Sequence, residues 1–183
     1  ITLCQKIISM KKGKFYESDY EEALINLLEQ QGWTYTYGGN IARNNREVLV
    51  SDDLSTYLKK RYKELTDSDI EEITNHLRFT SGQTHFELLR NTFHLIRDGY
   101  RYTRNSDGKI FDIEYVDFEF GNTNNIYSCV NQFEVGYGLK ANIRIPDVLL
   151  FINGIPLCIF ELKNPTDANA TIARAFIVAL LNT

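Results

Sequence analysis

Residues 144–165 read RIPDVLLFINGIPLCIFELKNP, and they are the most informative part of the chain for its architecture. Two apolar runs, 143–152 and 155–162, meet at Asn153-Gly154. Asn-Gly between hydrophobic runs is the strongest local signal of a β-hairpin. Because successive residues in both runs are apolar, both faces of the strands are expected to be covered, as in a central sheet flanked by helices. The stretch therefore predicts an α/β fold.

Charged residues stand at the ends of these two runs. Asp147 begins the first strand, and Glu161 and Lys163 close the second. Burying an unpaired carboxylate is costly, and a divalent cation is a reason to place two of them here, because Mg²⁺ takes oxygen ligands from one or two carboxylates. Such an ion activates a bound water for phosphodiester hydrolysis. Lys163 points to the same side of its strand as Glu161 and can orient the attacking water.

The register of the hairpin tests this metal-site hypothesis. Regular pairing around a two-residue turn places Asp147 opposite Phe160 and turns Glu161 to the other face of the sheet. A bulge restores the shared face, so we predict that the hairpin is bulged, either at Gly154 or near Pro146. With regular pairing throughout, the charged residues would be ordinary solvated strand ends.

The rest of the chain supplies the other elements of a single domain over residues 1–183. We expect a basic arm at 1–16, then a first core helix and a short strand at 17–37. In that helix Ser18 and Glu21 fit a capping box, and Gly32 fits a helix stop. Capping residues and apolar spacing predict a helical insertion over 51–99. Residues 100–183 are expected to complete the sheet core, with the active-site hairpin at 143–163 and a final helix at 169–181.

Composition limits the classes of function. The 183 residues carry 20 Lys+Arg and 24 Asp+Glu, for a formal net charge of −4 and a pI near 5.4. A small domain that binds nucleic acid by bulk charge is usually basic, which argues against simple DNA coating but not against DNA chemistry at a metal site. Three widely spaced cysteines indicate neither a disulfide framework nor a zinc site. No apolar stretch approaches the roughly 20 residues that span a bilayer, so we expect a cytoplasmic protein without a membrane partner.

Two further patterns bear on nucleic acids and nucleotides. Basic and aromatic residues alternate in one segment, which contains Arg97, Tyr100, Arg101, Tyr102 and Arg104. Arginines can bind phosphates, and bases can stack on tyrosine rings. Given the acidic total, an exposed strand face without a DNA role is the simpler interpretation. The chain has no GxxxxGK[ST] loop, so no ATP site of that kind is expected within it.

The opening stretch resembles the N-terminal nuclease domain of the R (restriction) subunit of type I restriction enzymes. That family reads R-P-D, an apolar strand, N-G-x-P and then E-L-K. Two other segments agree with it, SDYEEALI at 18–25 with GW at 32–33, and VNQFEV at 130–135. The resemblance implies a PD-(D/E)xK restriction-endonuclease-like core, a central mixed β-sheet flanked by helices with a helical insertion, that cuts double-stranded DNA with Mg²⁺.

Residue by residue, the resemblance assigns Asp147, Glu161, Lys163 and Glu21 to catalysis. It assigns the metal to Asp147, Glu161 and Leu162. For Glu21 the competing interpretation is the capping box. The family also has a Q-x-x-x-Y motif on the helix after the lysine, and this motif is absent here, because IVALL follows directly after residue 176.

The resemblance also implies partners. An ATP-driven translocase is expected to follow in a longer R subunit, with ATP acting only there, and modification and specificity subunits are expected to select the DNA. Two alternatives stay open, namely a stand-alone repair-type nuclease of the same fold and a non-cleaving docking module. The first would use the same residues, and the second is disfavoured by the joint presence of Asp147, Glu161 and Lys163.

Overall fold

A computed structural model describes residues 16–119, 121, 124–137 and 142–162 of the chain. Its elements, in chain order, are α2 (Glu17–Gln30), β1 (Thr34–Tyr37), a 3₁₀ turn η1 (Gly38–Asn40), α3 (Ser51–Arg61), α4 (Asp67–Arg78), α5 (His85–Asp98), β2 (Tyr100–Thr103), β3 (Ile110–Ile113), β4 (Tyr127–Asn131), β5 (Val135–Tyr137), β6 (Asn142–Arg144), β7 (Val148–Ile152) and β8 (Ile155–Phe160). The predicted arm up to residue 15 and the predicted final helix at 169–181 lie outside the described residues.

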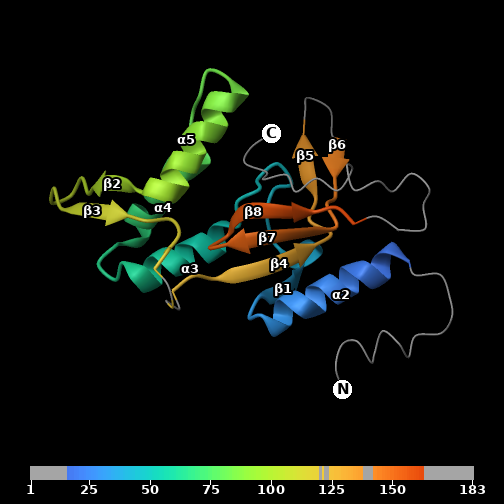
Figure 1. Cartoon of the computed structure of the whole chain (residues 1–183). Helices are drawn as coiled ribbons and strands as arrows, with labels where there is room; N and C mark the ends of the chain where they lie inside the picture. Colours follow the sequence, from blue (N-terminus) through green and yellow to red (C-terminus); the bar gives the residue numbers. More distant parts are fainter. Residues whose placement is uncertain (1–15, 120, 122–123, 138–141, 163–183) are drawn as a thin grey trace.

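Four strands form the central sheet, in the order β1-β4-β7-β8 (Figure 1). The sheet is mixed, because β1 runs parallel to β4 whereas β7 is antiparallel to both β4 and β8. Helix α2 covers one face, where Ile25 and Leu28 pack with Cys129 and Val148. Side chains of the other face form a second core cluster around Phe151, together with residues of the segment that leads into α3. The predicted α/β fold with a central mixed sheet flanked by helices is confirmed.

Helix α2 is capped differently from the prediction. It begins at Glu17, and the Asp19 carboxylate accepts a hydrogen bond of 2.8 Å from the backbone N–H of Tyr16. Asp19 therefore plays the capping-box role at an earlier helix start, at the N–H of Tyr16, whereas the predicted box would have used the N–H of Ser18. The predicted capping box of Ser18 and Glu21 is wrong, and the Glu21 side chain is available for another contact.

Two helices of the helical insertion, α4 and α5, start where their capping residues predict. The Thr66 hydroxyl accepts a 3.2 Å hydrogen bond from the Asp69 backbone N–H at the start of α4. At the start of α5, the Thr84 hydroxyl does the same for Glu87 at 3.2 Å. These bonds replace helical partners that the first turn lacks, which is why threonine is favoured at both positions.

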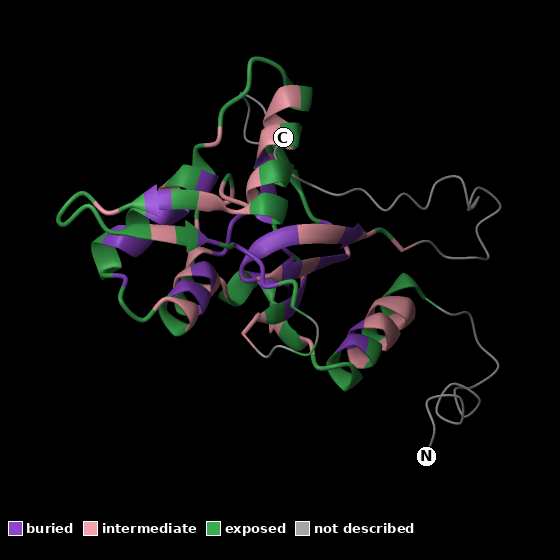
Figure 2. Cartoon of the chain, turned by 60° about the vertical axis from the view of Figure 1, so that its left-hand side comes forward, coloured by how far each residue is buried: buried purple, intermediate pink, exposed green. Residues whose placement is uncertain are grey.

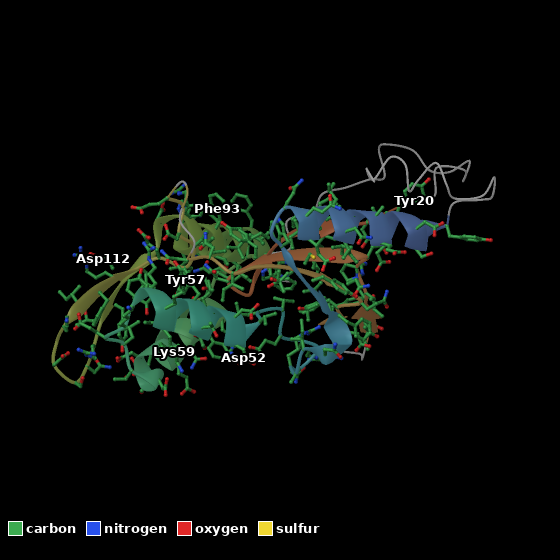
Figure 3. All side chains as sticks on the ribbon, turned by 90° about the horizontal axis from the view of Figure 1, so that it is seen from below. Tyr20, Asp52, Tyr57, Lys59, Phe93 and Asp112 are labelled. Atoms are coloured by element: carbon green, nitrogen blue, oxygen red, sulfur yellow. The ribbon has the colours of Figure 1, made fainter. Side chains whose placement is uncertain are left out.

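Helix α3 has one buried and one exposed side. Tyr57 is fully buried, and Figure 3 shows it turned toward the centre of the molecule, with Asp52 and Lys59 on the outer side. In Figure 2 the buried residues follow the central strands and the inner sides of the surrounding helices. Among the described residues, no helix combines the length and the apolar character needed to cross a membrane.

Strands β2 and β3 form a separate two-stranded antiparallel sheet. Tyr102 and Ile113 of this hairpin are buried in the core cluster that α3 and α4 also build. Just beyond the hairpin, the Tyr115 hydroxyl donates a 2.9 Å hydrogen bond to the carbonyl oxygen of Ile73. The helical part of the molecule thus continues past residue 99, where the sequence placed the start of the sheet core.

The turn between β7 and β8 is anchored to three other segments. Asn153 and Gly154 have φ values of 53° and 75°, as a two-residue type I′ turn requires. The Asn153 side chain is fully buried; it accepts a hydrogen bond from the Ile126 N–H at 2.7 Å and donates one to the Tyr115 carbonyl oxygen at 2.9 Å. The Gly154 carbonyl oxygen accepts from the Val50 N–H at 2.8 Å. The hairpin is therefore held to the helical part as well as to β4.

Candidate active site

The predicted site lies at the end of the central sheet where β4 and β8 finish and β7 begins (Figure 1). Asn131, Val148 and Phe160 are neighbours across these three strands. One further step along β7 and β8 from the last pair reaches Asp147 and Glu161, which this register sets opposite each other. Directly opposite residues of an antiparallel pair share a face of the sheet. The register therefore directs the two carboxylates to one side.

A β-bulge in β8 produces this register. Next to the turn, Ile152 pairs with Ile155, but further along Leu150 pairs with Cys158, so that Leu157 is an extra residue on β8. The neighbouring Pro156 has no N–H, and β8 is the edge strand of the sheet as far as the chain is described. An edge strand is where proline is tolerated. The prediction that the hairpin is bulged is confirmed. Both predicted positions, Gly154 and the vicinity of Pro146, are wrong.

Asp147 is tied to the end of β8 by a hydrogen bond. Its carboxylate accepts from the backbone N–H of Leu162 at 2.5 Å. Asp147 is half-buried and Glu161 is exposed, so the pair stands at the boundary between core and solvent. The bond holds one of the two Asp147 carboxylate oxygens in place.

Glu21 reaches the same end of the sheet from α2. Its carboxylate accepts a 2.7 Å hydrogen bond from the side-chain amide of Asn131, the strand neighbour of Val148. The Tyr35 hydroxyl donates to the amide oxygen of Asn131 at 3.0 Å. These residues border a hollow of about 360 Å³ beside α2. The structure thus brings Glu21 to the same end of the sheet as Asp147, but on the face that α2 covers. Asn131 pairs with Val148, which packs under α2. The register directs Asp147 to the other face, with Leu149.

The comparison with protein families gives this arrangement a context. A family model described as "Type I restriction enzyme R protein N terminus" matches residues 14–177. The chain belongs to this family. Its mixed sheet flanked by helices is consistent with a restriction-endonuclease-like fold.

Curated relatives agree with the family. The chain is 36% identical over 172 residues to the type I restriction enzyme HindI endonuclease subunit of Haemophilus influenzae, covering 87% of this chain and 16% of that protein. It is 29% identical over 187 residues to a putative type I restriction enzyme MjaIXP endonuclease subunit of Methanocaldococcus jannaschii, covering 91% and 17%. A third relative, the SauCOLORF180P endonuclease subunit of Staphylococcus aureus, is 30% identical over 156 residues, covering 81% and 15%. The chain therefore spans about a sixth of the length of these relatives.

Two elements expected of this R protein region lie outside the described residues. They are Lys163 and the segment around residue 176 where the Q-x-x-x-Y motif is missing. Of the predicted metal ligands, Leu162 has an apolar side chain and can offer only its backbone carbonyl oxygen. Within the described ranges, no group of three or more His, Cys, Asp and Glu side chains is placed to hold a metal. The paired carboxylates of Asp147 and Glu161 are a donor set that fits Mg²⁺, which keeps several of its waters and needs only one or two carboxylates.

Asn131 and Tyr35 are the residues of this R protein site that the sequence did not reveal. Asn131 stands within the VNQFEV segment, but nothing in its local pattern predicts a contact with a helix 110 positions away. Its position at the last residue of β4 is the only available signal. The contact depends on how α2 lies on the sheet, and local patterns contain no information on that.

Proposed function

We propose that this R protein region cleaves double-stranded DNA in a Mg²⁺-dependent reaction, as the nuclease of a type I restriction enzyme. The observation that carries the proposal is the bulged register that sets Asp147 opposite Glu161. Like charges placed opposite each other on a sheet repel. A bound cation offsets that repulsion.

Each residue then has a chemical task. Asp147, Glu161 and the carbonyl oxygen of Leu162 would hold the ion, which lowers the pKa of a bound water and offsets charge on the scissile phosphate. The hydrogen bond from the Leu162 N–H keeps Asp147 oriented before the ion arrives, so that little ordering is needed at the moment of reaction. Lys163, two positions after Glu161 in the sequence, is proposed to orient the attacking water.

Glu21 is proposed as a further acidic group at this end of the sheet, on the face that α2 covers. The Asn131 amide donates to one of its oxygens and the Tyr35 hydroxyl orients that amide in turn. Such a chain of hydrogen bonds fixes the direction of a carboxylate that lies on a separate helix. Because Asp19 caps α2, the helix does not need Glu21 for its own stability.

The whole protein is proposed to work with partners. Since this chain spans about a sixth of its relatives, an ATP-driven translocase in the rest of the R subunit is proposed to move the DNA. Modification and specificity subunits are proposed to choose the site. The curated relatives described above are named as endonuclease subunits of type I enzymes, which favours this assembly over a stand-alone nuclease or a docking module.

Cleavage by the full-length subunit, assembled with its modification and specificity partners, tests the proposal. We expect cutting of plasmid DNA that EDTA abolishes and added Mg²⁺ restores. Asp147→Asn, Glu161→Gln and Lys163→Ala should each slow cleavage about 100-fold or more, and Glu21→Gln about 10-fold. Asp112→Asn removes an exposed carboxylate of the separate β2–β3 hairpin and should leave cleavage unchanged. Undiminished cutting by both Asp147→Asn and Lys163→Ala would refute the assignment.

A further inference from the structure

The β5–β6 hairpin leaves the central sheet beside the proposed site. Strand β6 ends at Arg144, three residues before Asp147, and β5 starts four residues after Asn131. An extended chain rises about 3.3 Å per residue, so the Arg144 and Asp147 backbones lie within about 10 Å of each other. A side chain on this hairpin is therefore within reach of DNA whose scissile phosphate sits at Asp147.

The Arg144 side chain is exposed and has a defined direction. Its guanidinium carbon lies 5.1 Å from the centre of the Tyr137 ring. The two residues share a face of the ribbon, because Arg144 pairs with Val135 and Tyr137 with Asn142. A ring orients a guanidinium group by a cation–π interaction without neutralising its charge.

Arg144 also lacks a carboxylate partner, unlike most other described arginines. Among the described residues it forms no ion pair, whereas the arginines that the sequence suggested for DNA contact are neutralised. Arg101 pairs with Asp112 at 3.1 Å and Arg104 with Asp107 at 2.7 Å. Ion pairs with carboxylates are formed by Arg61, Arg78, Arg97, Arg101 and Arg104. The planar fork of an unpaired guanidinium suits two parallel hydrogen bonds to a phosphate.

The base of the hairpin is held firmly. The Gly136 N–H donates to the Asn45 carbonyl oxygen at 2.8 Å, and a Cβ atom added at Gly136 would lie 2.9 Å from the Asn45 side chain. Val135 is buried in the same cluster as Phe133. Because the hairpin backbone is already held in place, Arg144 loses little conformational freedom when it binds a ligand.

We propose that Arg144 binds a backbone phosphate of the DNA next to the bond that is cut. The inference rests on the proposed nuclease function and adds to it a substrate-positioning contact on a separate hairpin. The contact depends on the charge of the phosphate and does not distinguish one base sequence from another. It becomes important once the other subunits have delivered the DNA, so its effect belongs to the cleavage step.

Single-turnover cleavage by the full-length assembled enzyme tests this contact, with Arg90→Ala as the matched control. Arg90 on α5 is likewise exposed and has no ion pair among the described residues. We expect Arg144→Ala to cut about tenfold more slowly than the control at low salt. Removing one phosphate contact lowers the salt slope by about one, so this deficit should shrink three- to fourfold between about 50 and 200 mM salt. Arg144→Lys should keep the steeper salt dependence of the wild type.

The outcomes separate the two proposals. A wild type that cuts, together with Arg144→Ala equal to Arg90→Ala, overturns the phosphate contact alone. A deficit that does not change with salt also overturns it, because a merely structural loss is not screened by ions. A wild type that does not cut with Mg²⁺ refutes the nuclease function and this inference with it.

Discussion

Asp117 is a buried charge with several partners in the helical part of the molecule. Its side chain is 1% exposed and forms an ion pair with Arg61. The Asn124 amide donates to the same carboxylate at 2.9 Å, and the Glu119 N–H donates at 3.1 Å. The hydrogen bond from Asn124, the bond from Glu119 and the charge of Arg61 lower the pKa of Asp117 despite its burial. No local pattern in the sequence distinguishes this aspartate from the exposed ones.

The lowered pKa gives a prediction for acid stability. A carboxyl whose pKa is lower in the folded chain stabilises the fold above its unfolded pKa, about 3.9, and this contribution is lost as the pH falls through the folded pKa. Asp117→Asn should therefore weaken the acid dependence of the unfolding free energy below about pH 4. At pH 7 it should cost about 2 kcal/mol, less than the usual cost of breaking a buried pair, because Arg61 also contacts Glu114.

Urea unfolding at several pH values measures both effects. Asp112→Asn is the control, since Asp112 pairs with Arg101 in an ion pair whose side chains are 78% and 69% exposed. Exposed pairs of this kind contribute about 0.2–1 kcal/mol. A profile for Asp117→Asn that runs parallel to that of the wild type between pH 7 and pH 3 would contradict the prediction.

Among the elements, the β7–β8 hairpin combines a predictable turn with an unpredictable strand. The Asn153-Gly154 turn follows from its residues, because both positions take positive φ. The bulge at Leu157 has no comparable local signal, since a one-residue shift in an all-apolar strand exchanges one apolar side chain for another. What selects the bulge is packing on both faces of the sheet together with the missing N–H of Pro156 on the edge strand.

Two glycine substitutions distinguish the stability cost of a strained turn backbone from the cost of disturbing the contact between the β7–β8 turn and Val50. Gly154 and Gly108 have similar φ values, 75° and 70°. A Cβ atom at Gly154 would lie 2.1 Å from the Val50 carbonyl oxygen, whereas at Gly108 nothing lies within 4 Å. Gly108→Ala should therefore cost about 1–2 kcal/mol from backbone strain alone. Gly154→Ala should cost about 3 kcal/mol or more, because the clash displaces the start of α3.

Thermal or urea unfolding of the two glycine variants distinguishes these costs. Equal losses of stability would show that the close approach of Gly154 to Val50 adds nothing to the cost of the Gly154→Ala substitution. A larger loss for Gly154→Ala would support the view that the hairpin is held from the helical side, as its hydrogen bond from the Val50 N–H indicates.

For the whole molecule, the excess of acidic over basic residues has a direct consequence for DNA affinity. The formal net charge is −4, and most described arginines are paired with carboxylates. Non-specific DNA affinity comes from unpaired cations that displace counterions, and it reaches dissociation constants of roughly 10⁻⁴–10⁻⁶ M for proteins that have them. The proposed phosphate contact of Arg144 adds only a single exposed cation beside the site.

We therefore expect the 183-residue chain alone to bind non-specific duplex DNA more weakly than about 10⁻⁴ M at physiological salt. Fluorescence anisotropy with a labelled duplex measures this, and a basic DNA-binding domain of similar size serves as the positive control. Micromolar binding that falls with added salt would contradict the expectation. Weak binding by this region would agree with our proposal that other parts of the enzyme hold the DNA.

Local patterns in the sequence were sufficient for the α/β class, the helix starts at Thr66 and Thr84, and the hairpin at Asn153-Gly154. These features depend on capping groups, apolar spacing and turn residues, all of which act within a few positions of the chain. The charged strand ends pointed to Asp147, Glu161 and Lys163, and the family pattern added Glu21 and Leu162. It did not supply the geometry that relates them.

The relative positions of those residues follow from the packing of the folded chain. The bulge at Leu157 sets Asp147 opposite Glu161, the Asn131 amide binds Glu21 on α2, and the β2–β3 hairpin joins the helical part instead of the central sheet. Each of these depends on contacts between segments far apart in the chain, where the best packing of the whole core outweighs local preference. A sequence pattern records which side chains are present, and the packed core determines which of them face one another.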